Sequence, residues 1–307
     1  MNVHDIVSDW ITLRAGALAP RTVESYRATV RLHITPLLGH RKAARLKPAH
    51  VSRLLSGLCE RGISRTAELV YIILRAAFRE AVRAGSIPAS PVDRVPPPRH
   101  FAADARWWSE GELKLFLASL QDDQFSLAWR LALCCGLRRG ELAGLRWCDV
   151  DLANRVLRIR NQRQRIGGRG VIDCPPKSKS ALRDIPLPDP LISALDRHFV
   201  LQSAENSLRG APECPYVLIS PSGAGFDPRG LHRAFKSACA SVSGVRSLSL
   251  HGLRHTMAAV SVSAGVSTRV LQSLLGHSSI TTTAAVYAHV VTDAQRAAID
   301  LVAASVL

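Results

Sequence analysis

Apolar residues in the first 95 positions recur at the three- and four-residue spacing of amphipathic helices. We expect one of these helices to end at Pro36, because a proline ring cannot continue a helix interior. Gly85 suits the end of a later helix, since glycine readily adopts the left-handed conformation that closes many helices. The apolar stripes are Val23, Tyr26, Val30 and Ile34; Val51, Leu54, Leu55 and Leu58; and Leu69, Ile72, Ile73, Ala76 and Ala77.

The sequence beyond residue 105 mixes helical stretches with short strands. Residues 156–160 alternate like a strand, and residues 183–187 form a second one. Gly167, Gly168 and Gly170 predict a turn. Helical patterns begin at Ser109, run from about Leu127 to Cys135, and return from Leu231 to the C-terminus.

A proline-rich stretch separates the two regions. Prolines there favour an extended, semi-stiff connection between two domains. We therefore predict a helical domain at 1–95, a linker at 96–105 and a second domain at 106–307. The change in character starts ahead of the linker, with Pro88, Pro91, Pro96, Pro97 and Pro98.

Composition narrows the class of protein. Hydrophobic residues make up 47% of the 307 positions, enough for a sizeable core in each of two domains. Lys and Arg number 40 against 24 Asp and Glu, which gives a net charge of +16. A globular chain this basic is typical of proteins that bind nucleic acid, with a generally basic protein lacking such a partner as the alternative.

Arginines recur along the expected N-terminal helices. Arg27, Arg31, Arg75 and Arg79 are our candidates for contacts with a DNA backbone. A solvated basic face is the alternative interpretation of the same residues.

The chain shows no sign of export. Its N-terminus lacks the features of a secretory signal, and no apolar run approaches the ~18 residues of a membrane span. The seven cysteines are odd in number and irregular in spacing, so we predict no disulfide framework. Most have apolar neighbours and are expected to be small core residues. These features indicate a reducing cytoplasm.

Two segments of the second domain place cations at fixed points. In residues 136–142 (GLRRGEL), Arg138 stands where one helix gives way to the next, and Glu141 can orient its guanidinium from the same turn. In residues 176–180 (PKSKS), a lysine at the tip of a turn can swing into a cleft. An exposed surface charge is the alternative for each.

A third segment, residues 251–256 (HGLRHT), carries two histidines and an arginine at helical spacing. His251 and Arg254 share a helix face, and His255 lies one turn from His251. A zinc protease pair would need Glu directly after the first His, where Gly252 stands, and no carboxylate or cysteine lies nearby. We favour a phosphate site, because Arg and His together donate several hydrogen bonds to one anion.

A fourth segment, residues 275–283 (LGHSSITTT), is followed by Tyr287. Of the four tyrosines, Tyr287 alone follows a Gly-His turn and a Ser/Thr-rich stretch, with small flanking residues. Its hydroxyl would then be accessible, whereas an isolated tyrosine is ordinarily a core or surface aromatic.

In this order the four segments resemble the tyrosine recombinase (phage integrase) family, whose pattern is Arg, Lys, His-x-x-Arg, His and Tyr. The likeness covers nearly the whole chain, and the stretch with Tyr26, His33 and Pro36 looks like the family's helical core-binding domain. It implies a mainly α fold with a small antiparallel β-sheet in the catalytic domain, and two domains that clamp DNA. We expect no separate arm-binding domain ahead of the first helix.

The resemblance implies a site-specific recombinase that cleaves and rejoins DNA strands. Tyr287 would attack a phosphodiester and form a 3′-phosphotyrosyl link, and Lys177 would protonate the leaving 5′-oxygen, with Lys179 as its rival. The other implied roles are phosphate binding by Arg138, Arg254, His251 and His277, and support by Glu141 and His255.

The family also implies double-stranded DNA as the partner, four protomers that pass through a Holliday junction, action at the nucleoid, and neither metal nor cofactor. The apolar tail from about Asp293 to Leu307 would pack on a neighbouring protomer or on its own domain. Rival interpretations are a type IB topoisomerase, which shares the tyrosine chemistry, and a DNA-binding regulator without catalysis. A metal-dependent nuclease is disfavoured, because no motif gathers Asp and Glu.

Overall fold

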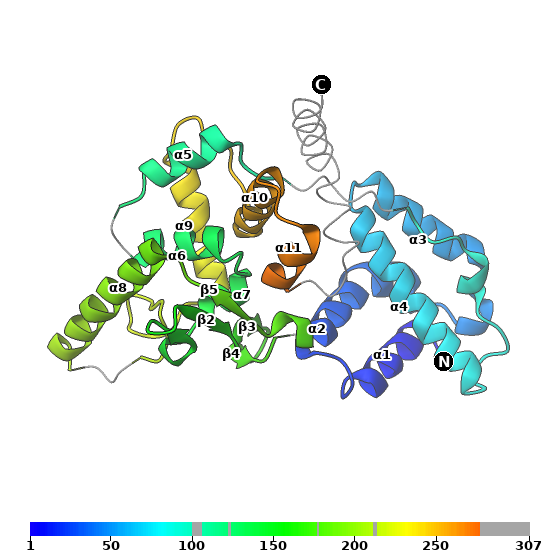
Figure 1. The fold of residues 1–307 in the computed structure, drawn as a ribbon. Helices are drawn as coiled ribbons and strands as arrows, with labels where there is room; N and C mark the ends of the chain where they lie inside the picture. The colour runs from blue at the N-terminus through cyan, green and yellow to red at the C-terminus, as the bar shows by residue number, and fades with distance from the viewer. Residues whose placement is uncertain (100–105, 122–123, 177, 211–213, 277–307) are drawn as a thin grey trace, which may run out of the picture. The chain divides into compact units, whose positions relative to one another are not determined.

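The structure is a computed structural model that describes residues 1–99, 106–121, 124–176, 178–210 and 214–276. Its contacts divide the chain into two compact units, Met1–Ala103 and Asp104–Leu307 (Figure 1). Within the described ranges, no helix is both long enough and apolar enough to cross a membrane.

Unit 1 is a helical bundle around a single apolar core. Its described elements are α1 (Val3–Arg14), α2 (Pro20–Thr29), the π-helix η1 (Val30–Gly39), the 3-10 helix η2 (Ala43–Arg45), α3 (Pro48–Glu60), α4 (Ser64–Arg83) and the 3-10 helix η3 (Pro91–Arg94). α4 lies against α1, α2 and α3, so it forms the centre of the bundle. Fully buried Val3, Ile34, Leu58 and Phe78 come from four different elements and meet in this core.

The prediction that a helix ends at Pro36 is wrong. α2 continues directly into η1, and Pro36 lies inside η1. Proline has no N–H and its ring crowds the carbonyl four residues earlier, and the wider turn of a π-helix relieves this clash. The apolar face of this segment is as predicted, with Val23, Val30 and Ile34 buried.

The apolar stripe predicted for α4 is partly wrong, whereas all four residues predicted for α3 are buried. Ile72 is 43% exposed, and the residues that face the core include Val70, Leu74 and Phe78. Because neighbours pack on several sides of α4, its buried face is wide, and periodicity alone does not locate the centre of that face. Gly85 follows α4 with a φ of +71°, in keeping with the predicted helix end.

Part of the proline-rich stretch is folded into unit 1. η3 packs against α3 and α4, and Val92 and Val95 are buried in the core. The change in composition at Pro88 therefore marks the last segment of the unit and not a free connection. The division of contacts after Ala103 falls inside the predicted linker, residues 96–105.

Unit 2 combines helices with short strands, and the predicted mainly α class with a small antiparallel β-sheet is confirmed. Its described elements are α5 (Glu110–Ala118), α6 (Gln124–Cys134), α7 (Arg139–Ala143), η4 (Trp147–Asp149), β1 (Val150–Asp151), β2 (Val156–Ile159), β3 (Gln162–Ile166), β4 (Gly170–Cys174), η5 (Lys179–Ala181), β5 (Arg183–Pro186), α8 (Asp189–Leu208), α9 (Pro228–Ala240), α10 (Leu250–Ser263) and α11 (Thr268–Leu275). β1, β2 and β5 pair in that spatial order, and β3 pairs with β4 in a separate hairpin, all antiparallel.

An aromatic cluster fixes the helices of unit 2. Trp108, Phe116, Trp129 and Phe235 have ring centroids 4.6–5.8 Å apart, in tilted and edge-on pairs. α6, which carries Trp129, also packs against α8 and α10. The turn that follows α6 is thereby held rigidly on this core.

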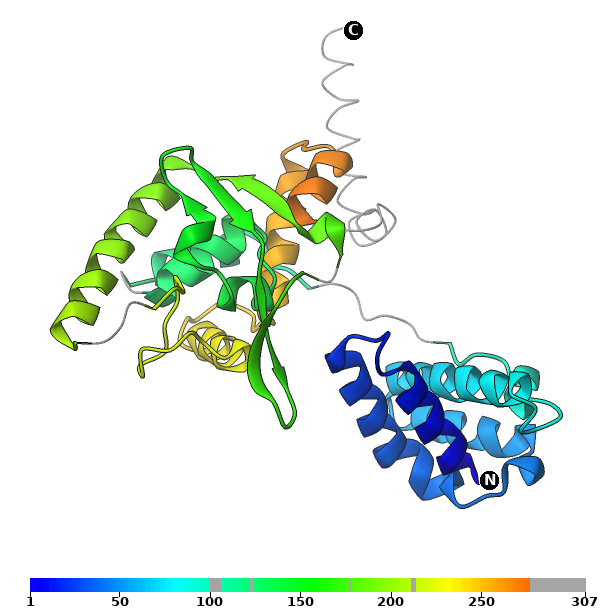
Figure 2. The ribbon, with the colours of Figure 1, turned by 90° about the horizontal axis from the view of Figure 1, so that it is seen from below.

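The sequence pattern did not predict two elements of unit 2, the β3–β4 hairpin and α8. The turn predicted at Gly167, Gly168 and Gly170 joins β3 to β4, but β3 (QRQRI) has no apolar alternation that would reveal a strand. β3 packs against α7 and α9, and the turn of this hairpin projects away from the three-stranded sheet (Figure 2). α8 was not predicted either, because its buried face includes two polar residues, Gln202 and Asn206, in place of a continuous apolar stripe.

The cysteines are mostly not core residues, contrary to our expectation. Cys135 and Cys239 are buried, whereas the others are half-buried or exposed. All seven are free, and the predicted absence of a disulfide framework holds. Apolar sequence neighbours are a poor guide to burial here, because successive residues of a helix or strand point to different sides.

Candidate active site

The turn between α6 and α7 presents Arg138. Gly136 makes this turn with a φ of +58°, a conformation that glycine adopts without strain. The backbone N–H of Arg138 donates to Glu141 Oε2 at 3.0 Å, and its Nη1 donates to Glu141 Oε1 at 2.7 Å. Glu141 thus fixes both the start of α7 and the direction of the Arg138 guanidinium.

α10 carries the three predicted residues of the HGLRHT segment. Arg254 is 1% exposed, and its Nη1 donates to the Gly136 carbonyl at 2.6 Å. It therefore ties α10 to the turn of Arg138. His251 is exposed, and its ring meets that of His255 edge-on with centroids 4.7 Å apart.

Three arginines bind three consecutive carbonyl groups at the end of α11. The donor–acceptor pairs are Arg183 Nε to Leu274 O at 2.7 Å, Arg254 Nη2 to Leu275 O, and Arg138 Nη2 to Gly276 O at 2.8 Å. The last carbonyls of a helix have no partner within the helix and carry partial negative charge, so cations there are stabilising. The residue after this triply bonded end is His277.

The lysine-bearing turn lies beside the same helix end. Gly276 closes α11 with a φ of +62°, and a Cβ at this position would lie 2.7 Å from the carbonyl oxygen of Ser180. Lys179 begins η5 in this turn and is exposed. Lys177, His277 and Tyr287 lie outside the described residues.

The β3–β4 hairpin that leads into this turn is anchored by polar contacts. Asp173 on β4 accepts hydrogen bonds from Tyr216 and, at 2.7 Å, from Arg146. Burial of Asp173 opposes ionisation, but these two donors and the nearby Arg163 outweigh it and lower the pKa of the carboxyl. A charged Asp173 therefore fastens the base of the hairpin to the body of unit 2.

Glu141 accepts hydrogen bonds from both Arg138 and Arg183. Arg183 donates to both of its oxygens, at 3.1 and 2.8 Å, in addition to the bonds from Arg138. Burial would raise the pKa of Glu141, but the hydrogen bonds and charges of Arg183 and Arg138 dominate and lower it to about 2. Glu141 is thus ionised at neutral pH although it is 2% exposed.

This depressed pKa predicts how stability depends on pH. A carboxyl whose pKa falls from 4.5 to about 2 on folding contributes stability that is present above pH 4.5 and is lost as the pH falls towards 2. We expect the free energy of unfolding of the wild type to drop by roughly 3 kcal/mol more over this interval than that of Glu141→Gln. Urea unfolding at pH 7, 4 and 2.5 measures the difference.

A matched control uses an exposed acid. Glu205 pairs with Arg209 at 3.7 Å, and both side chains are more than half exposed, so Glu205→Gln should follow the wild-type curve. Equal pH dependence in the wild type and Glu141→Gln would show that the Glu141 carboxylate is not stabilised by its arginines.

The two histidines are held in the neutral form. Although part of His251 is exposed, neighbouring atoms crowd its ring, and this desolvation, followed by the charges of His255, Arg254 and Arg138, lowers the pKa of His251 to about 4. Burial and Arg254 lower the pKa of His255 as well. At neutral pH, His251 is therefore uncharged and keeps a free nitrogen lone pair. Within the described ranges, no three His, Cys, Asp or Glu residues gather closely enough to hold a metal ion.

Two protein-family models match this chain. The model of the phage integrase family matches residues 112–293, and that of the phage integrase central domain matches residues 3–96. The first match alone covers more than half of the chain. The chain belongs to the phage integrase family of tyrosine recombinases.

Similar proteins agree with this assignment. A tyrosine recombinase XerC-like protein of Caldanaerobacter subterraneus is 28% identical over 95% of this chain and 80% of its own. An integrase of Saccharopolyspora erythraea is 26% identical over 90% of this chain and 77% of its own. The fold matches that of the Tn1549 transposon integrase in complex with transposon right end DNA, with a TM-score of 0.83 and 23% identity, covering 99% of this chain and 100% of the other.

Among the described residues, Arg183 bonds Glu141 and the end of α11 but was not predicted from the sequence. The strand prediction covered it, but the period-2 alternation of β5 places Arg183 on the same face as the buried Ile185. A charged residue in phase with core positions needs a buried partner. That signal was present in the sequence, although the partner, Glu141, was not identifiable from it.

The four arginines predicted to bind DNA lie in unit 1. Arg27 on α2 and Arg31 on η1 are exposed. Arg75 and Arg79 on α4 share the carboxylate of Asp93, at 3.5 and 2.8 Å. Because exposed pairs of this kind are weak, the four residues remain candidates for phosphate contacts.

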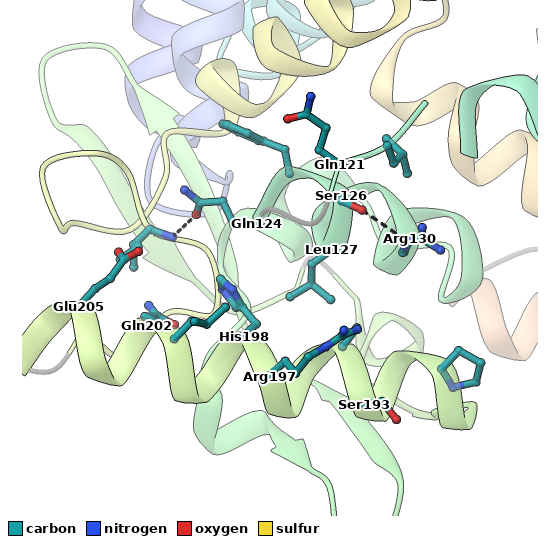
Figure 3. Close-up of a pocket in the computed structure, with 16 residues that line it drawn as sticks. Gln121, Gln124, Ser126, Leu127, Arg130, Ser193, Arg197, His198, Gln202 and Glu205 are labelled. Carbon is teal, nitrogen blue, oxygen red and sulfur yellow. Dashed lines mark hydrogen bonds between the residues drawn. The ribbon is translucent and has the colours of Figure 1, made fainter. Parts of the chain in front are cut away.

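A separate cavity of about 720 Å³ lies between the start of α6 and α8 (Figure 3). Gln124 and Phe125 line one side, and His198 and Gln202 of α8 line the other. In the close-up, the Gln124 side chain accepts a hydrogen bond from the backbone of Ile219 at 3.3 Å. Of the predicted catalytic residues that the structure describes, Arg138, His251 and Arg254, none lines this cavity.

Proposed function

We propose that the integrase is a site-specific recombinase that cleaves and rejoins DNA through a 3′-phosphotyrosyl link to Tyr287. One observation carries the assignment of the site: Arg138 and Arg254 meet at the end of α11, one residue before His277. They come from segments more than a hundred residues apart along the chain. Convergence of cations at one point is what an attacked phosphodiester requires.

The cationic cluster would stabilise the charge that builds up in the five-coordinate transition state. Arg138 is 32% exposed and can offer its remaining donors to a non-bridging oxygen, and His251 lies exposed near it. Arg254 is buried, so direct contact with the phosphate requires its guanidinium to become uncovered when DNA binds. In either position, its charge strengthens the local positive field.

Tyrosine is a poor nucleophile when neutral, since its ordinary pKa is near 10. A neutral His251 can take the phenolic proton, and Lys177 can protonate the leaving 5′-oxygen. The tyrosyl ester conserves the energy of the broken bond, so rejoining needs no nucleotide. These roles of Tyr287, Lys177, His251 and His277, with Glu141 and His255 as supports, are our proposal.

Double-stranded DNA is the proposed substrate, and Arg27, Arg31, Arg75 and Arg79 are proposed backbone contacts. The lambda integrase, which shares the fold with a TM-score of 0.69, is known as a tetramer bound to a Holliday junction. We propose a similar tetramer for this chain, acting at the nucleoid. A type IB topoisomerase-like activity and a catalytically inactive DNA-binding regulator are the alternatives.

Covalent trapping tests the proposal. The DNA site is first selected from randomised duplexes by binding to the Tyr287→Phe protein. A nick is then placed beside the expected cleavage point, so that the released fragment diffuses away and the covalent complex accumulates. We expect a protein–DNA adduct that survives denaturing electrophoresis.

The adduct should form at the same rate with EDTA present, because cationic side chains supply the charge neutralisation. Loss of the adduct in EDTA would indicate metal-dependent cleavage. DNA binding without any adduct would support the inactive regulator, and relaxation of supercoils without exchange between two sites would support the topoisomerase.

A further inference from the structure

We infer that Arg183 is a positioning residue for strand cleavage. Its guanidinium couples the Arg138–Glu141 pair to the end of α11, which directly precedes His277. The inference rests on the proposed function and goes beyond it, because Arg183 is 8% exposed and is not among the residues proposed to hold the phosphate.

The contacts of Arg183 form a closed circuit. Its Nη1 and Nη2 donate to the two oxygens of Glu141, while Glu141 Oε1 also accepts from Arg138 at 2.7 Å. Arg138 Nη2 in turn donates to the carbonyl of Gly276, and Arg183 Nε donates to the carbonyl of Leu274 two residues earlier. Arg138 and Arg183 thus share the carboxylate of Glu141, and both donate hydrogen bonds to the end of α11.

A buried ion pair does not by itself imply a role in catalysis, since many such pairs belong to ordinary cores. Here, however, the acid partner of Arg183 is the residue that orients Arg138, and its backbone partner belongs to the helix end that holds Arg254 and Arg138. Nη1 makes one further bond, to the carbonyl of Ala181 at 3.1 Å, in the turn that follows Lys179. Arg183 therefore contacts α7, which begins after Arg138, the end of α11, which precedes His277, and the turn that contains Lys179. It makes no such bond to α10 among those described.

The geometry requires a guanidinium in particular. A planar fork offers five donors in fixed directions, so one side chain can satisfy Leu274 O and both oxygens of Glu141 together. A lysine ammonium is a single point charge and cannot reach all three acceptors in this arrangement. Without the second cation, Glu141 would draw Arg138 further onto its own oxygens, and the end of α11 would lose one of three donors.

Arg183→Lys tests the inference, with Arg158→Lys as the matched control. Arg158 bonds Asp151 at 2.6 Å in the same sheet, but its side chain is 37% exposed and its partner lies on β1, not on α7 or α11. Each full-length protein is mixed in excess with the nicked suicide duplex, and adduct formation is followed over a single turnover. DNA affinity and the melting temperature are measured in parallel.

We expect Arg183→Lys to lower the rate constant of adduct formation roughly 10- to 100-fold, as a displacement of about 1 Å at a reacting centre would. DNA affinity should stay within about threefold of wild type, because exposed phosphate contacts are unaltered. Arg158→Lys should react at the wild-type rate. Arg183→Gln, which keeps a donor but loses the charge, should be at least as slow as Arg183→Lys.

The single-turnover curve separates positioning from folding. Molecules that are misfolded lower the amplitude of the reaction, whereas a misplaced Arg138 or His277 lowers its rate constant. A wild-type rate constant with reduced amplitude would overturn the inference and leave Arg183 a purely structural residue. If the wild-type protein forms no adduct, it is the proposed function that fails, so the two failures are distinguishable.

Discussion

Tyr287→Phe is expected to abolish the covalent protein–DNA adduct while leaving DNA affinity unchanged within about twofold. Phenylalanine retains the ring and loses only the hydroxyl, so binding contacts persist while no atom remains to attack the phosphorus. The effect should be complete, because the cationic cluster of Arg138 and Arg254 has no other nucleophile proposed beside it. Denaturing electrophoresis with labelled DNA, and a gel-shift titration, measure the two quantities.

Tyr71→Phe is the matched control for this experiment. Tyr71 is 6% exposed in the core of unit 1, where phenylalanine preserves the packing. The Tyr71→Phe protein should form the adduct at the wild-type rate. An adduct that persists in Tyr287→Phe would show that another residue attacks the DNA and would remove Tyr287 from the mechanism.

Lys177→Ala is expected to slow strand cleavage about 100- to 1,000-fold, the usual contribution of a general acid. The leaving 5′-oxygen is an alkoxide of high basicity and must be protonated as it departs. If the 5′-oxygen is replaced by sulfur, the leaving thiolate is far less basic, with a pKa near 8.5, and needs no proton. Lys177→Ala should therefore cleave the sulfur-containing duplex at nearly the wild-type rate.

Lys179→Ala distinguishes the two lysines of the turn. Lys179 is exposed at the start of η5, and its removal should slow cleavage of both duplexes less than tenfold. The reverse pattern, with sulfur rescuing Lys179→Ala and not Lys177→Ala, would transfer the role of general acid to Lys179. Equal slowing of the oxygen and sulfur duplexes in both variants would place the acid elsewhere.

Local signals in the sequence predicted a large part of the fold. Ser109 accepts a hydrogen bond from the backbone of Glu112 as the cap of α5, and Gly85 and Gly136 end helices in left-handed conformations. These features depend on a few consecutive residues, so they can be predicted without knowledge of the rest of the chain. α8 and the β3–β4 hairpin were missed, because their stability comes from contacts with distant segments, such as the bond from Gln202 to the carbonyl of Tyr216 at 3.0 Å.

The candidate site shows the same contrast. The spacing of His251, Arg254 and His255 placed them on one helix, and the short separation of Arg138 and Glu141 predicted their contact, which is present. Arg183 was overlooked, because its acceptors at Glu141 and Leu274 lie 42 and 91 positions away along the chain. The role of a buried arginine can be inferred only when the groups that accept its hydrogen bonds are known.

The sequence by itself determined the helical character of unit 1, several helices and strands of unit 2, the positive charge of the chain, and the set of residues that matches the recombinase pattern. These follow from side-chain identity and near-neighbour spacing, which are properties of short segments. Only the tertiary structure decided that Arg138, Arg183 and Arg254 converge on three successive carbonyls of α11. The physical reason is that hydrogen bonds act over about 3 Å, and which distant residues come that close is set by the packing of the whole unit.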